Sequence, residues 1–165
     1  MAKSRVFSTR IDLPPASRES AIALLNQHLA DTFDLGSQIK QAHWNVKGPN
    51  FIALHELFDD LAESVEEYID LIAERATALG GYALGTARMA AAASRLPEYP
   101  VDAVDGKQHV EALVARFAAL GKTTRAAIDA SNEFSDADTA DLFTEVSRGI
   151  DKHLWFLEAH LQSAS

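Results

Sequence analysis

The chain of 165 residues contains no cysteine and no run of apolar residues long enough to cross a membrane. The lack of cysteine excludes disulfides and thiolate-ligated metal sites, and with them a small secreted domain held together by disulfides. The opening stretch MAKSRVFSTRIDLPP also lacks the apolar segment of a secretion signal. We therefore expect a soluble, cytoplasmic protein without membrane contact.

Basic residues are also scarce. Lysine and arginine number 15 against 24 aspartates and glutamates, which gives a formal net charge of −9. This balance argues against a broadly basic surface that binds nucleic acid. The composition is nevertheless 47% hydrophobic, enough for one domain with a substantial core.

Helical periodicity and helix-breaking residues divide the chain into long helices. The expected spans are residues 17–44, 51–79, 106–130 and 137–161, with a short alanine-rich helix at 87–93. Ser17 is the expected N-cap of the first helix, and Ser135 or Asp136 that of the last. An all-α fold follows: a four-helix bundle with one long crossover between its second and third long helices. Residues 1–16 are expected to form a flexible arm, and 17–165 the bundle.

The second helix carries two pairs of possible metal ligands. His55 and Asp59 are four residues apart, as are Asp70 and Glu74, so each pair shares a helix face. The eleven positions between Asp59 and Asp70 rotate the chain by about 1100°, which returns to within about 20° of the same face. Along the axis, however, the pairs are about 16 Å apart, whereas metal–ligand bonds measure about 2 Å. One chain cannot close this site.

A two-fold dimer removes the difficulty. Suppose that the same helix of a second copy packs antiparallel and crosses near Ser64. The His55/Asp59 pair of one chain then faces the Asp70/Glu74 pair of the other, and the two-fold symmetry produces two identical sites. His43 precedes a Gly-Pro turn and can fold back beside His55. Nitrogen and oxygen donors without sulfur suit iron or manganese, with zinc as a competitor. The Glu-x-x-His pair of commoner di-iron bundles is absent from this helix.

Each of these residues also has an ordinary explanation. Acidic residues on a helix face are most often simply solvated, and a lone histidine among apolar neighbours is usually a core or interface residue. The combination of two histidines and three carboxylates in phase is what favours a metal site. From spacing alone, the metal site and the metal-free bundle remain comparable alternatives.

Around these residues the sequence resembles the Dps family, the mini-ferritins of the ferritin-like superfamily. The resemblance covers most of the chain and is carried by HWNVKGPNFIALHELFDDL and IDLIAERATALGG, with ligand spacings of 12, 4, 11 and 4. It implies that His43, His55 and Asp59 are ligands from one subunit, and that Asp70 and Glu74 come from its two-fold mate. It also implies a hollow dodecamer that oxidises ferrous iron, preferably with hydrogen peroxide, and stores ferric mineral.

Further acidic residues acquire possible roles from the resemblance. Glu56, Asp60 and Glu63 would line the cavity and help to nucleate mineral, the alternative being a solvated helix face. Acids near the start of the last helix would line three-fold pores that admit iron, although they also suit helix capping and the helix dipole. The candidate pore residues are Glu133, Asp138 and Asp141, with Asp136 as an alternative to Asp138. Trp44, beside His43, would sit near the iron and intercept oxidising equivalents, although packing is its simpler role.

The N-terminal arm offers a second class of function. Lys3, Arg5 and Arg10 give it a few positive charges for a weak, salt-sensitive contact with DNA, multiplied if many copies lie on one particle. The competing hypothesis is therefore a nucleoid-compacting, DNA-binding structural protein with minor ferroxidase activity. The net charge of −9 argues against it, and a frayed terminus explains the arm equally well.

Overall fold

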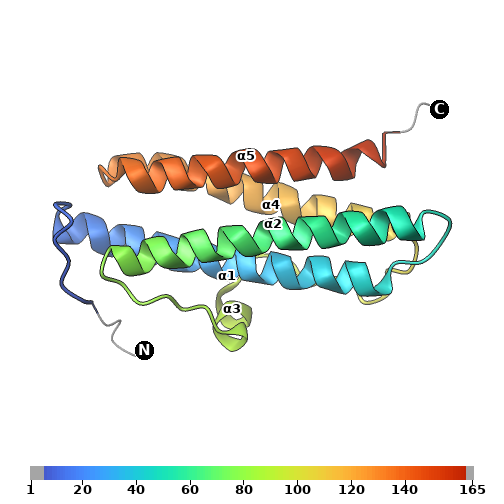
Figure 1. Cartoon of the computed structure of the whole chain (residues 1–165), viewed down its shortest axis with the longest axis horizontal. Coiled ribbons are helices and arrows are strands. Elements are labelled where there is room, and N and C mark those ends of the chain that lie inside the picture. Colours follow the sequence, from blue (N-terminus) through green and yellow to red (C-terminus); the bar gives the residue numbers. More distant parts are fainter. Residues whose placement is uncertain (1–5, 163–165) are drawn as a thin grey trace.

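A computed structural model describes residues 6–162, and this part of the chain is built from helices (Figure 1). The long helices lie side by side, whereas the short helix stands outside them. In chain order they are α1 (Pro15–Asn45), α2 (Phe51–Ala78), α3 (Ala87–Ala93), α4 (Gly106–Glu133) and α5 (Ala137–Ala159). The all-α expectation is confirmed, and α3 has the bounds that the alanine-rich stretch indicated.

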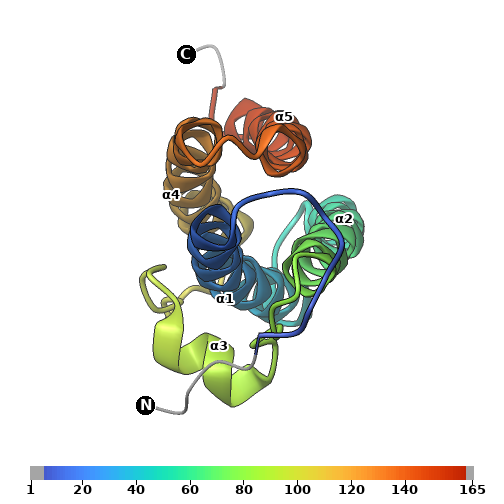
Figure 2. The same ribbon diagram turned by 90° about the vertical axis from the view of Figure 1, so that its left-hand side faces the viewer.

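Seen end-on, α1, α2, α4 and α5 form a four-helix bundle, with α3 packed outside it near α1 (Figure 2). Two clusters of buried side chains fill the bundle. One is centred on Phe58 and Phe117, and the other on Leu25 and Phe143. No helix within residues 6–162 is both long and apolar enough to cross a bilayer.

The start of α1 differs from expectation. Ser17 is not its N-cap, because the helix begins at Pro15, with Pro14 in the capping position and no side-chain cap. Proline is well tolerated in the first helical turn, where its missing N–H would have no partner and its fixed φ suits the helix. The pair Pro14-Pro15 therefore starts the helix, and the segment before the bundle ends at residue 14 instead of 16.

The described part of the N-terminal arm lies against the bundle. The Phe7 N–H donates to the Gly80 carbonyl at 2.7 Å, and Ile11 and Leu13 pack on the second core cluster. Gly80 has a φ of 88°, and a β-carbon there would collide with the Phe7 carbonyl oxygen. Glycine at this position thus both ends α2 and makes room for the arm.

Buried polar contacts hold the crossover to α1. Asp31 is 1% exposed and accepts hydrogen bonds from the Arg95 backbone N–H at 2.7 Å and from the Arg95 side chain at 2.5 and 2.9 Å. Gln38 donates to the Pro97 carbonyl and accepts from Arg116. The long connection is therefore fixed in place, even though it contains little secondary structure.

Three buried histidines make stability depend on pH. Burial lowers the pKa of His28, His109 and His153 from the ordinary value of 6.5. Each also has one ring nitrogen without a hydrogen-bond partner among the described residues. Below about pH 6.5 the unfolded chain takes up protons that the folded chain resists, so acid favours unfolding.

We predict that the free energy of unfolding falls as the pH is lowered from about 7.5 to about 5. His28→Gln should reduce this pH dependence, whereas His160→Gln, at an exposed position, should leave it unchanged. Chemical denaturation at a series of pH values measures both slopes. Equal slopes in the wild-type protein and His28→Gln would show that His28 does not contribute.

Candidate metal centre

His43 of α1 and His55 of α2 form a reciprocal pair where the two helices meet beside the Gly-Pro turn. Their ring centroids are 3.7 Å apart and the rings are nearly parallel, with an interplanar angle of 20°. Nδ1 of His43 lies 2.8 Å from the His55 carbonyl oxygen, and Nδ1 of His55 lies 2.9 Å from the His43 carbonyl oxygen. We call this arrangement the histidine pair. It ties α1 to α2 and brings together two of the proposed ligands.

The histidine pair also decides which nitrogen can bind a metal. A carbonyl oxygen only accepts hydrogen bonds, so each Nδ1 carries the proton and donates. In a neutral ring, Nε2 then keeps its lone pair free. Metal-binding histidines commonly use their second ring nitrogen in this way, because the hydrogen bond fixes both the tautomer and the ring orientation.

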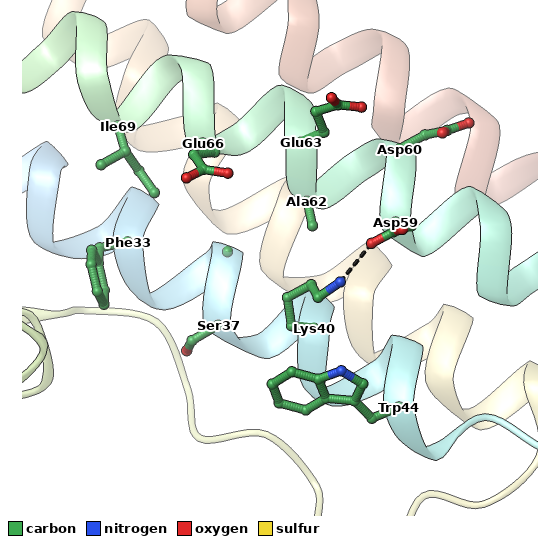
Figure 3. Close-up of a pocket in the computed structure, with 11 residues that line it drawn as sticks. Phe33, Ser37, Lys40, Trp44, Asp59, Asp60, Ala62, Glu63, Glu66 and Ile69 are labelled. Carbon is green, nitrogen blue, oxygen red and sulfur yellow. Dashed lines mark hydrogen bonds and ion pairs between the residues drawn. The ribbon is translucent and has the colours of Figure 1, made fainter.

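Asp59 lies next to the histidine pair but is already paired with Lys40 (Figure 3). Lys40 Nζ is 2.5 Å from Asp59 Oδ1, and His43 Nδ1 is 4.0 Å from the same oxygen. The hydrogen bond from Lys40 holds the pKa of Asp59 below its usual value, so the carboxyl group is ionised. The side chain of Asp59 is 59% exposed, which leaves it accessible to a cation.

The other two proposed ligands lie farther along α2. Asp70 and Glu74 are both exposed, and the unbroken helix from Phe51 to Ala78 keeps them about 16 Å and about 22 Å from Asp59 along its axis. Within residues 6–162 of one subunit, no three histidine, aspartate or glutamate side chains come close enough to hold one ion. The structure therefore places His43, His55 and Asp59 near one another, although not close enough to hold one ion, and leaves Asp70 and Glu74 farther along α2.

Two grooves connect these separate parts of α2. One, of about 620 Å³, contains Lys40, Trp44 and Asp59, and the other, of about 580 Å³, contains Asp70. Phe33, Glu63, Glu66 and Ile69 line both of them. The α1–α2 face is thus hollowed from one proposed ligand pair toward the other.

The predicted nucleation and pore residues are exposed. Glu56, Asp60 and Glu63 all lie on the outside of α2, and two of them, Asp60 and Glu63, also line the larger groove. Glu133 ends α4, whereas Asp138 and Asp141 lie in the first turns of α5. Their exposure leaves them free to meet ions, and their pore and nucleation roles stay predictions.

Asp136, the alternative pore residue, is not available for that role. It is 1% exposed and pairs with Arg75, whose Nη2 lies 2.6 Å from Oδ1. It also caps α5 by accepting from the Thr139 backbone N–H and hydroxyl. We call this group the corner ion pair. It joins the end of α2 to the start of α5, and the N-cap prediction for Asp136 is confirmed.

Of the three basic residues proposed to contact DNA, Lys3 and Arg5 lie outside the described residues, and Arg10 is exposed.

Trp44 is 64% exposed, and the Lys40 ammonium lies 6.0 Å from the centroid of its ring. His109 and His153 are buried, whereas His160 is on the surface.

Sequence reasoning missed Lys40. It lies three residues before His43, so helical spacing already placed the two side chains on neighbouring faces of α1. A basic residue one helical turn from a proposed ligand indicates that it could pair with a carboxylate of the site, and the sequence contained this signal. Its pairing with Asp59, nineteen residues away, required the packing of α1 on α2.

The chain is similar to known proteins over most of its length. The family model described as "Ferritin-like domain" matches residues 22–165. A "DNA protection during starvation protein" from Agrobacterium fabrum is 44% identical over 161 residues, which cover 98% of this chain and 99% of the relative.

Solved structures give the same result. The Dps protein of Mycobacterium smegmatis, in a tetragonal form, superposes with a TM-score of 0.91 at 32% identity, covering 95% of this chain and 94% of the other. A Dps protein from Vibrio cholerae O1 superposes with a TM-score of 0.88 at 26% identity, covering 94% and 97%. The latter is described as a member of a broad superfamily of ferritin-like diiron-carboxylate proteins.

The corner ion pair leads to a stability prediction. Asp136→Ala should lower the free energy of unfolding by about 3–5 kcal/mol, because it removes the N-cap of α5 and leaves the mostly buried Arg75 with only a 3.8 Å contact to the exposed Asp138. Asp138→Ala is the matched control, since its side chain is 85% exposed and the change should stay within about 0.5 kcal/mol. Denaturant unfolding at one protein concentration compares them. Equal stabilities would contradict a structural role for Asp136.

Proposed function

Since the chain belongs to the Dps proteins of the ferritin-like family, we propose that it oxidises ferrous iron and stores the ferric product. The observation that carries this proposal is the histidine pair. Its two rings donate their Nδ1 protons to backbone carbonyls, which leaves both Nε2 lone pairs free, and the ionised Asp59 has an oxygen 4.0 Å from His43 Nδ1. Iron enters as substrate, and zinc and manganese are its competitors for such donors.

A second copy of the chain completes the site. We place Asp70 and Glu74 of a two-fold mate opposite His43, His55 and Asp59, so that each dimer has two sites. The grooved face between α1 and α2 is where the mate packs. Two-fold dimers then assemble into a hollow dodecamer, with Glu133, Asp138 and Asp141 at its iron pores and Glu56, Asp60 and Glu63 on its inner wall.

The donor set suits the oxidation. Carboxylates stabilise Fe(III) over Fe(II), because hard anionic oxygens favour the higher charge, while imidazole retains useful affinity for Fe(II). The preferred oxidant in the proposal is hydrogen peroxide. It takes one electron from each of two Fe(II) ions and two protons from solvent, and gives two water molecules. Because peroxide is consumed without hydroxyl radical, DNA is protected even without contact.

Lys40 competes with iron for Asp59. The ammonium lies 2.5 Å from Asp59 Oδ1, so it repels a cation that approaches this carboxylate and competes for that oxygen. An ammonium that iron displaces remains within the groove, near Trp44 and the carboxylates of Asp60 and Glu63. Lys40 therefore lowers the affinity of the empty site for cations and holds Asp59 in place until iron arrives.

The proposal is tested by stopped-flow oxidation of Fe(II) with peroxide. We expect rapid oxidation by the wild-type protein and loss of the fast phase in His43→Ala/Asp59→Ala. The control is His160→Ala/Asp102→Ala, which removes the same residue types from exposed positions elsewhere. Light scattering on each sample confirms that particle size is unchanged. Equal rates in all three intact particles would overturn the site assignment.

A second prediction concerns Lys40. Lys40→Met should tighten binding of Co(II), a redox-stable stand-in for Fe(II), by a few-fold, because Asp59 loses its internal counter-ion. Calorimetric titration of the metal-free particle measures the affinity, with Lys122→Met on the exposed face of α4 as control. Unchanged affinity in Lys40→Met would show that the Lys40–Asp59 pair does not compete with metal.

A further inference from the structure

Tyr99 and His109 form a second aromatic pair, and neither of them lines the two grooves of the α1–α2 face. Tyr99 lies in the crossover and His109 in the first turn of α4. The Tyr99 hydroxyl is 2.6 Å from Nδ1 of His109, and the two rings are stacked at a centroid distance of 6.0 Å. His109 is 1% exposed and Tyr99 is half-buried. Neither residue belongs to the candidate metal centre.

The Tyr99 hydroxyl can donate a proton, and Nδ1 of His109 can accept it. Burial raises the pKa of Tyr99 to about 12, so the phenol keeps its proton at rest. Burial lowers the pKa of His109, so its ring is neutral near pH 7 and can accept a proton at Nδ1. The backbone of Asn45 and Val104 partly offsets this lowering of the pKa of His109, which burial dominates.

Arg116 couples electron loss at Tyr99 to this proton transfer. Its guanidinium carbon is 5.8 Å from the Tyr99 ring centroid and is held by Gln38 and by the Ala112 and Glu98 carbonyls. A fixed positive charge beside the ring opposes a tyrosine radical cation, since like charges repel in a partly buried site. Tyr99 can therefore lose an electron readily only if its proton leaves at the same time.

The pair is also close to the proposed iron site. His109 lies beside the backbone of Asn45, two residues after His43 on α1. His43 contacts α2 and His109 belongs to α4, so α1 separates the two sites by roughly one helix diameter, about 10–12 Å. Tyr99 packs on the core cluster that contains Ala42 and Val46 of the same helix. Helix α1 thus lies between the pair and the proposed iron site.

We propose that Tyr99 and His109 form a redox-active pair that donates one electron to oxidants formed at the iron site. This inference rests on the proposed function for its source of oxidant. When peroxide meets a single Fe(II) instead of two, one-electron chemistry gives Fe(III), hydroxide and hydroxyl radical. The Tyr99–His109 pair then protects the particle from this by-product.

The electrons and protons balance. Tyr99 gives one electron to the hydroxyl radical, which takes a proton from solvent and becomes water. The phenolic O–H bond breaks and its proton passes to Nδ1 of His109, leaving a neutral tyrosyl radical and an imidazolium. A later Fe(II) returns one electron to Tyr99, and His109 returns the proton. The pair is thereby restored, and one more iron has been oxidised.

The first experiment needs no iron. Photogenerated ruthenium(III) tris-bipyridine oxidises the metal-free particle, and electron paramagnetic resonance detects the radical, with ring-deuterated tyrosine to distinguish it from a Trp44 radical. We expect a tyrosyl signal in the wild-type protein, its loss in Tyr99→Phe, and its retention in Tyr82→Phe, at an exposed tyrosine. His109→Gln should weaken the signal while Tyr99 remains. An equal signal in wild type and Tyr99→Phe overturns the proposal.

The second experiment freeze-quenches the same variants with Fe(II) and peroxide, and records iron oxidation and the radical together. A signal that disappears in Tyr99→Phe, weakens in His109→Gln and persists in Tyr82→Phe supports the proposal. Normal iron oxidation without a Tyr99 radical overturns it. If the wild-type protein does not oxidise iron, the proposed function fails, while the photochemical experiment still decides whether the pair is redox-active.

Discussion

Two hydrogen bonds between α1 and α2 determine what this fold can do. In the histidine pair, His43 and His55 each donate to the other's backbone carbonyl, at 2.8 and 2.9 Å. The same bonds join the helices next to their connecting turn and leave each Nε2 free. Because a bare histidine has two alternative tautomers, this fixed choice makes the pair a prepared set of donors. The position of Asp59, one turn farther along α2, then follows from the helix itself.

The rest of the bundle maintains this arrangement with a few buried charges. Asp31 receives three hydrogen bonds from Arg95 and fixes the crossover to α1. Asp136 forms an ion pair with Arg75 and so joins the end of α2 to the start of α5. Breaking a buried pair costs far more than breaking an exposed one, because the remaining charge is left without water or partner. The histidine pair therefore holds the start of α2 and the corner ion pair holds its end, while its acidic face stays open for ions.

Much of the fold was predictable because helices depend on local sequence. The periodicity of apolar residues and the Gly-Pro and Gly-Gly breaks placed the helices within a few residues, and the ligand phasing of α2 needed only its numbering. The exceptions depend on tertiary contacts. Lys40 meets Asp59, Tyr99 meets His109, and Asp136 is buried by Arg75 instead of facing a pore. Residue spacing along one helix cannot predict side-chain contacts between separate segments of the chain.

The central claim is that each iron site is shared between two subunits, and mixed particles test it most directly. One subunit carries His43→Ala/Asp59→Ala, and the other carries Asp70→Ala/Glu74→Ala. Each variant alone should lack the fast oxidation of Fe(II). Co-assembly in equal amounts should restore about a quarter of the wild-type activity, because half of the dimers are mixed and each of these has one intact site. No recovery in mixed particles of normal size would contradict a shared site.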